Sequence, residues 1–148
     1  MVEVNRIKKI RYKGKTKIVW EVDRDDGGTD EFSINCCDQP TPGFLEKIQD
    51  LARHVCEICR FQKGYEKGLV VQGISITYEE KGMGVCITAL KALPDLDSPL
   101  VINTPYCIEE KWSTAMADAI IYVCSAAEAY LNGERAQMEL AVTSEGKS

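Results

Sequence analysis

The chain has 148 residues, of which 45% are hydrophobic and 28% are charged, and its formal net charge at pH 7 is −5. This length favours one domain with a buried core, and the composition excludes an intrinsically disordered chain. The charge is uneven, because residues 1–17 carry seven basic side chains against Glu3, a balance of +6, and leave −11 for the rest. The acidic remainder of the chain does not attract nucleic acid, but the basic N-terminal stretch can bind a phosphate group.

The first predicted elements are two half-buried strands near the N-terminus. Apolar side chains take the even positions and basic side chains the odd positions, which is the period-2 alternation of a strand pair joined at Lys-Gly-Lys-Thr. The even set is Ile10, Tyr12, Ile18, Trp20 and Val22, and the odd set is Lys9, Arg11, Lys13, Lys15 and Lys17. A short third strand is expected at residues 31–35, after a turn rich in Asp and Gly.

The next predicted element is a helix within residues 39–61. Thr41 is a good N-cap, and Pro42 suits the first helical position, where its missing N–H costs nothing. Apolar residues then follow at helical spacing from Phe44 to Cys59 and form one stripe.

The second part of the chain repeats this order. Residues 68–80 and 84–93 are strand candidates rich in β-branched side chains, and residues 99–103 make a shorter one. A second helix is predicted within residues 103–133, where Asn132-Gly133 offers a left-handed stop.

The predicted order is therefore β-β-(β)-α-β-β-β-α. It indicates an α+β fold, with an antiparallel sheet of about five or six strands and two helices on one face. We expect a single domain over residues 1–140 and a flexible tail over residues 141–148. Both helices are expected to begin at Thr-Pro, at Thr41-Pro42 and Thr104-Pro105, which hints at internal doubling.

The only histidine, His54, stands two residues ahead of the pair Cys56 and Cys59. A redox Cys-x-x-Cys pair needs a helix N-terminus, where the dipole stabilises the thiolate, but this pair falls near the C-terminal end of the predicted helix. A zinc site needs four converging ligands, and positions 54 and 56 point in different directions on a helix. We therefore predict packed thiols, with no metal, cofactor or catalytic residue; a metal-dependent enzyme built on these side chains is the alternative.

The compartment is predicted from the cysteines and the N-terminus. Seven cysteines at irregular spacing do not suggest a disulfide framework, and the first ten residues have no apolar signal region, so a cytoplasmic protein is expected. The most apolar stretch is interrupted by Asp118 and Glu128 and is too short to span a bilayer, so no membrane contact is expected.

The five odd-numbered cations would share one face of a two-stranded ribbon. Such a face can follow a phosphate backbone or hold a polyphosphate. It can equally be a solvated sheet face, or an edge strand protected by lysines, and charged outer faces are the usual case. Stacking on bases is not indicated, because Tyr12 and Trp20 belong to the other face.

Residues 69–93, 99–105 and above all 129–140, which read AYLNGERAQMEL, resemble a family of small proteins encoded in bacteriophage and prophage early regions. In that family a Gly-(Lys or Glu)-Arg-Ala-Gln segment follows the final helix, and the similarity spans most of residues 5–140. Family members tend to stop soon after the motif, often at a phenylalanine, whereas this chain continues with a polar tail. The resemblance implies no catalytic residues, and it implies an intracellular, phage-derived accessory protein.

The segment after the final helix can pack back on its own sheet, as apolar chain ends of small domains often do, or it can dock on a subunit or partner. Its polar residues Arg135 and Gln137 are candidate contact residues, together with the five cations of the ribbon. A homo-oligomer is expected, because a short sheet with an apolar terminal segment often completes its core in a partner.

The leading hypothesis is a non-enzymatic binding protein of phage origin that counters host defence by binding a host protein or an anionic ligand such as a nucleotide. The alternative is an accessory protein of phage DNA replication or recombination that binds single-stranded nucleic acid through the basic ribbon.

Overall fold

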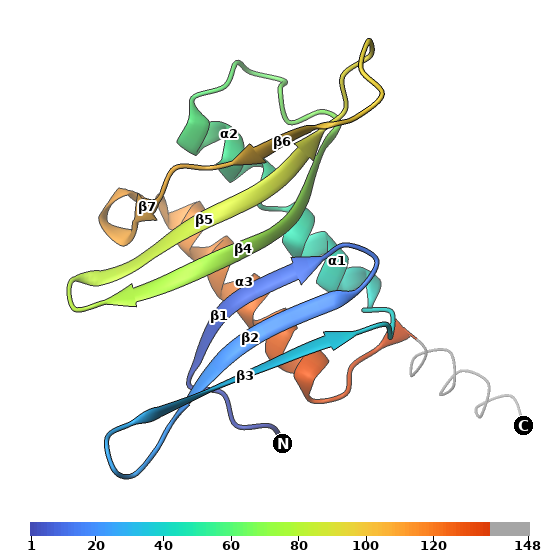
Figure 1. Cartoon of the computed structure of the whole chain (residues 1–148). Coiled ribbons are helices and arrows are strands. Elements are labelled where there is room, and N and C mark those ends of the chain that lie inside the picture. The colour runs from blue at the N-terminus through green and yellow to red at the C-terminus, as the bar shows by residue number, and fades with distance from the viewer. Residues whose placement is uncertain (137–148) are drawn as a thin grey trace, which may run out of the picture.

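The computed structural model describes residues 1–136, which form one antiparallel sheet of seven strands with helices on a single face (Figure 1). The strands are β1 (Arg6–Tyr12), β2 (Thr16–Asp23), β3 (Thr29–Cys36), β4 (Leu69–Glu79), β5 (Gly82–Lys91), β6 (Leu100–Asn103) and β7 (Cys107–Ile108). The helices are α1 (Pro42–Gln49), α2 (Ala52–Cys59), the short 3₁₀ helix η1 (Glu109–Lys111) and α3 (Thr114–Leu131). Six strands follow in the order β3-β2-β1-β4-β5-β6, and β7 pairs with β5.

This architecture confirms the predicted α+β fold with its antiparallel sheet and one-sided helices. The first helix begins as expected, because the Thr41 hydroxyl accepts the Phe44 N–H at 3.2 Å. It is not a single helix, however. α1 and α2 meet at Asp50 and Leu51, and Asp50 is a weak helix former in an interior position.

The second predicted helix begins later than its sequence suggests. Thr104 extends the sheet instead of capping a helix, since its N–H donates to the Ile87 carbonyl and its hydroxyl accepts the Ile87 N–H, both at 2.9 Å. The true N-cap is Ser113, whose hydroxyl accepts the Met116 N–H at 3.1 Å. The second Thr-Pro pair is therefore a strand end, and the predicted cap there is wrong.

The strand order nevertheless divides the sheet into two similar halves. Strands β1 to β3 with α1 and α2 form one half, β4 to β6 with α3 form the other, and the halves meet where β1 pairs with β4. The residue pairs at this seam are Lys9 with Ser75, Ile10 with Ile74, and Arg11 with Gly73. An approximate twofold axis at the central pair would produce this order, so the doubling lies in the topology and not in the Thr-Pro dipeptides.

The helices of the two halves also correspond. Together α1 and α2 span positions 42–59, and α3 spans positions 114–131, so each boundary is shifted by 72 positions. Buried residues match at the same shift: Phe44 with Met116, Ile48 with Ile120, Leu51 with Val123, and Val55 with Ala127. Because a helix buries residues three and four apart, both helical segments turn the same stripe towards the core.

Each half is covered by the helices of the other. Helices α1 and α2 pack on β4 and β5, whereas α3 packs on β1. The Gln49 side chain ties α1 to β4, since it donates to the Leu69 carbonyl at 2.7 Å and accepts the Val71 N–H at 3.1 Å. The Tyr130 hydroxyl, near the end of α3, donates to the Asp38 carbonyl at 2.8 Å. A complete core therefore needs both halves.

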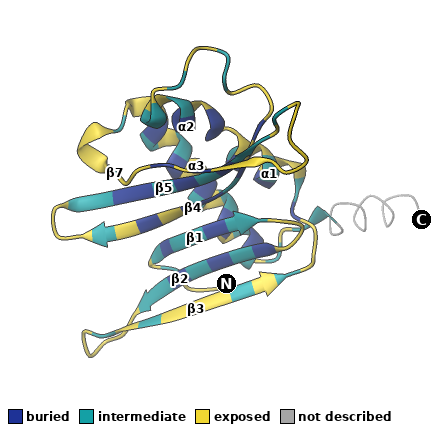
Figure 2. Cartoon of the chain, turned by 45° about the horizontal axis from the view of Figure 1, so that its top comes forward, coloured by how far each residue is buried: buried dark blue, intermediate teal, exposed yellow. Residues whose placement is uncertain are grey.

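A row of isoleucines crosses the helix-covered face of the sheet. From β3 to β5 its members, in register, are Ile34, Ile18, Ile10, Ile74 and Ile87. Full burial of one such side chain contributes about 1.5–3 kcal/mol to stability. Alternate residues point to the opposite face, which none of the described helices covers and which we call the open face. Figure 2 shows this alternation of buried and less buried residues along the central strands.

Candidate anion-binding groove

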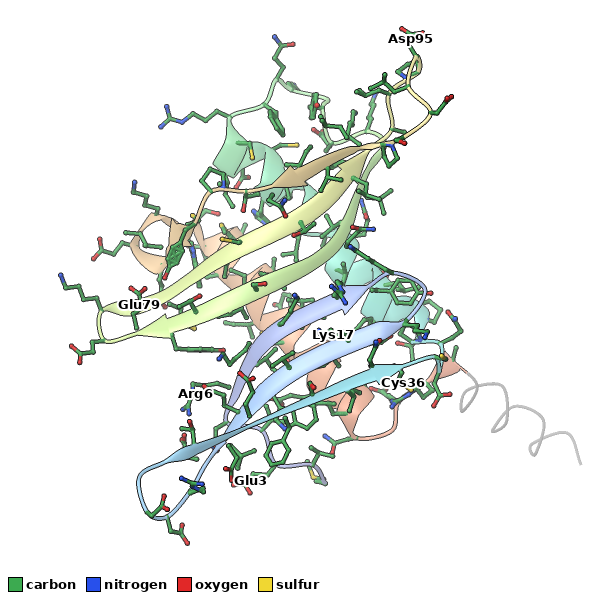
Figure 3. All side chains as sticks on the ribbon, in the orientation of Figure 1. Glu3, Arg6, Lys17, Cys36, Glu79 and Asp95 are labelled. Atoms are coloured by element: carbon green, nitrogen blue, oxygen red, sulfur yellow. The ribbon has the colours of Figure 1, made fainter. Side chains whose placement is uncertain are left out.

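A groove of about 270 Å³ lies over the β1–β4 seam on the open face. We call it the cationic groove. Its polar and charged lining residues are Lys9, Arg11, Lys13, Ser75, Thr88 and Asn103. They come from both halves of the sheet, because β1 and its turn supply the cations while β4, β5 and β6 supply the rest. Figure 3 views the sheet from this side, with the helices behind it, and labels Lys17 on β2.

Gly73 allows the two halves to meet closely beneath the groove. A Cβ at this position would collide with the Ile10 carbonyl oxygen and would lie 3.0 Å from the Arg11 Cα. The register of β4 also shifts between Val71 and Gly73, an irregularity of the kind that bends a strand. Since Gly73 pairs with both Arg11 and Thr88, the floor between these two residues has no side chain.

The first cations of β1 are neutralised by carboxylates. Arg6 pairs with Glu21 at 3.1 Å and with Asp23, and the Lys8 ammonium lies 2.9 Å from Glu31. Lys8 reaches these acidic groups because the register of β1 shifts between Ile7 and Lys9, which places an extra residue in the strand. These pairs hold β1, β2 and β3 together on the open face and leave little net charge there.

The cations around the groove are different, because Lys9, Arg11, Lys13 and Lys17 form no ion pair with any described residue. Partial burial, together with the positive charges of Arg11, Lys17 and Lys13, lowers the pKa of Lys9. Four like charges gathered without a counter-charge destabilise the protonated lysine. A bound anion would relieve this repulsion, so the groove is electrostatically suited to one.

The structure distributes the five predicted cations over two settings. Lys9, Arg11 and Lys17 stand on the open face, where Arg11 pairs in register with Lys17. Lys13 and Lys15 stand in the β1–β2 turn, where the Lys13 N–H donates to the Lys15 carbonyl at 3.1 Å. Of the five, Lys9, Arg11 and Lys13 line the groove.

The other residues of the groove cannot be predicted from the sequence. They are Gly73, Ser75, Thr88 and Asn103. The alternation within residues 68–80 and 84–93 indicates which side chains share a face, but no local signal places β4 beside β1. Pairing between strands that are distant in sequence decides the opposite wall of the groove.

The candidate contact residue Arg135 lies against its own domain. Its guanidinium carbon stands 3.4 Å from the centroid of the Tyr130 ring, and its Nε lies 3.8 Å from an Asp38 carboxylate oxygen. The segment after α3 therefore packs back on the chain at this point. Gln137 and the predicted tail at 141–148 lie outside the described residues.

The His-Cys stretch lies where the sequence places it, in α2 near the C-terminal end of the helical segment. His54 is 2% exposed, and its Nδ1 lies 3.1 Å from a Glu57 carboxylate oxygen. Burial raises the pKa of the Cys56 and Cys59 thiols, and it raises that of Cys124 in α3 to about 12. In the described part of the chain, no three His, Cys, Asp or Glu side chains are grouped as a metal site requires.

Two of the clefts elsewhere on the molecule have volumes of about 350 Å³ each. The first lies between α1 and α3, and Lys47 and Glu134 are its charged lining residues. The second brings Arg60 and Lys111 together with Glu57. Since a carboxylate accompanies the cations in each cleft, neither has the concentrated positive charge of the cationic groove.

Comparisons with models of protein families, with curated proteins and with solved structures found no match to this chain. Among the described residues there is no helix with the length and apolar character needed to cross a membrane.

Proposed function

We propose that the protein is a non-enzymatic binding protein that sequesters a phosphate-bearing ligand in the cationic groove. The observation that carries this proposal is the contrast along β1, where Arg6 and Lys8 are paired with carboxylates, whereas Lys9 and Arg11 are paired with none of the described residues. Lysine and arginine are the side chains that recognise phosphate, and here they line one groove.

The chemistry of the groove favours holding a ligand over transforming it. The described residues that line it include no carboxylate, imidazole or thiol, the side chains that most often act as a base or a nucleophile. Among the described residues that line the groove, the hydroxyl groups of Ser75 and Thr88 have cations and an amide as neighbours and no carboxylate or imidazole to take a proton.

We place this binding in a phage-derived accessory protein that acts in the cytoplasm of the host bacterium and counters host defence by withholding the ligand. The resemblance of residues 129–140 to early-region phage proteins supports the setting. A host protein that presents an anionic group to the same cations is the other form of this proposal, and the size of the groove favours the small ligand.

Isothermal titration with inorganic pyrophosphate at low salt tests the anion site. We expect saturable binding by the native protein, and a loss of at least about 100-fold in affinity for the double variant Lys9→Glu/Arg11→Glu, because two charge-assisted contacts are reversed. The matched control is Lys15→Glu, which reverses a charge in the same hairpin outside the groove and should retain the affinity. Equal losses in both variants would contradict a localised site.

The exposed turn supports a second candidate function, binding of single-stranded DNA. Lys15, beside Lys13 in the turn, extends the positive charge beyond the groove to the tip of the hairpin, so a strand of DNA could follow it. In that case the affinity for oligothymidylate would fall steeply with salt, and Lys15→Glu would weaken it as much as Lys9→Glu. Retained affinity in Lys15→Glu excludes this candidate.

A further inference from the structure

The two sides of the cationic groove differ in kind. The β1 side presents the charges of Lys9, Arg11 and Lys13, whereas the β5–β6 side presents Thr88 and Asn103, which are polar and neutral. The backbones of the two halves are therefore related by the approximate twofold axis, but the side chains that they contribute to the groove are not. A ligand that was only an anion would use one side and leave the other to water, so the opposite wall indicates a ligand with a second, neutral part.

The neutral wall offers a donor and an acceptor side by side. The Thr88 hydroxyl donates to the Asn103 Oδ1 at 2.8 Å, which holds the amide in one orientation. The Asn103 amide nitrogen has no hydrogen-bond partner among the described residues, and the Thr88 oxygen keeps a free lone pair. This pair complements a planar edge that carries an acceptor next to a donor, as the hydrogen-bonding edges of nucleobases do.

An apolar strip continues the same wall. Val101 lines the groove and is 57% exposed, and it pairs in register with Leu90, which pairs in turn with Val70, itself 55% exposed. Exposed β-branched side chains next to a polar pair can pack against the flat face of a ring. Removing this apolar surface from water contributes favourably to the free energy of binding. The charges thus lie on the β1 side, whereas the hydrogen-bonding edge on β5 and β6 lies directly beside the apolar strip, which crosses β4, β5 and β6.

The size of the groove limits the ligand. Its volume of about 270 Å³ is close to the lower end, about 300 Å³, of the range for small-molecule sites. One ring system with one sugar phosphate matches that volume, and a longer oligonucleotide does not. We propose that the ligand is a mononucleotide, with its phosphate on Lys9 and Arg11 and its base against Thr88, Asn103 and Val101. This assignment rests on the proposed anion-binding function and names the class of anion.

Nuclear magnetic resonance titration of the ¹⁵N-labelled protein tests the assignment, because it measures weak as well as strong binding. The probes are the four ribonucleoside 5′-monophosphates and ribose 5-phosphate, which has the same sugar phosphate and no base. We expect at least one nucleotide to bind about tenfold more tightly than ribose 5-phosphate, the effect of roughly one or two added hydrogen bonds.

Variants of the neutral wall locate the base. Thr88→Val and Asn103→Leu should each lower the affinity for the nucleotide to about that for ribose 5-phosphate, and the amide spectrum shows that each variant is folded. Thr77→Val makes the same substitution on the open face of β4 outside the groove and should keep the preference. A preference that survives in Thr88→Val and Asn103→Leu overturns the inference. Equal affinities for all five probes also overturn it while leaving the anion site intact, and no binding by any probe overturns the anion site as well.

Discussion

Similar residues in this protein have different roles because their neighbours differ. Arg6, Lys8, Lys9 and Arg11 are cations of one strand, yet the first two bind carboxylates, while the other two line a groove to which residues 1–136 contribute no carboxylate. His54 and the cysteines of α2 are potentially reactive, but burial withdraws the imidazole from water and raises the pKa of the thiols. The local environment of a residue, and not its type, therefore distinguishes the residues of the candidate site from those with a structural role.

The lowered pKa of Lys9 gives a prediction about stability. Because the folded state binds this proton more weakly than the unfolded state does, Lys9 destabilises the protein at neutral pH, and the penalty is lost as pH rises through the lowered pKa towards the ordinary lysine value of about 10.4. Lys9→Met should therefore raise the melting temperature at pH 7 by about 1–2 °C, an effect of the size expected for a surface substitution.

Differential scanning calorimetry at pH 7 and near pH 10.5 checks this sign. The gain should shrink at the higher pH, and Lys15→Met, in the exposed turn, should change the melting temperature little at either pH. A lower melting temperature for Lys9→Met at pH 7 would show that the crowding of cations does not weaken the fold.

At the scale of elements, the two helical segments follow one plan with one difference. Each starts at a hydroxyl N-cap, Thr41 or Ser113, that accepts the N–H three residues later, and each buries the same stripe. The first is interrupted at Asp50 and the second is continuous. The two N-caps should therefore contribute similarly to the free energy of unfolding.

We expect Thr41→Ala and Ser113→Ala each to lower the free energy of unfolding by about 1 kcal/mol, because each leaves a helix N–H without its acceptor. Urea denaturation followed by circular dichroism measures both. Ser125→Ala, at an exposed position inside α3, is the control and should be neutral or slightly stabilising, since alanine is the better interior residue. A loss confined to one of the two caps would contradict the equivalence of the helices.

At the scale of the whole molecule, the exchange of helices between the halves makes them interdependent. The core of the second half includes α1 and α2, which follow β3 in the chain, and that of the first includes α3, which follows β7. Neither half can open without exposing apolar surface of the other, so unfolding should be a single cooperative transition.

One tryptophan in each half makes this testable. Trp20 lies in β2, and Trp112 precedes α3, where its indole N–H donates to the Cys107 carbonyl at 3.0 Å. In Trp112→Phe the fluorescence reports on the first half, and in Trp20→Phe on the second. Within each variant, the urea midpoints from fluorescence and from circular dichroism should coincide, and separated midpoints would show that the halves unfold independently.

Features that depend on neighbours along the chain could be predicted from the amino-acid sequence. Alternation at period 2 and apolar stripes at helical spacing predicted the strands, the α+β class, the cap at Thr41 and the face that carries Lys9, Arg11 and Lys17. Predictions from local sequence were wrong where pairing with a distant strand decided the structure. At Thr104, for example, the hydroxyl accepts the Ile87 N–H in the sheet instead of capping a helix.

The strand neighbours, and with them the candidate site, are known from the folded structure and not from local sequence patterns. The cationic wall of the groove could be predicted from the alternation in β1, but its neutral wall comes from β5 and β6, which are more than fifty residues away along the chain. Gly73, unremarkable in a strand pattern, became the floor because Ile10 of another strand approaches it. The physical reason is that side-chain periodicity is set by local backbone geometry, whereas strand partners are chosen by burial of the whole core.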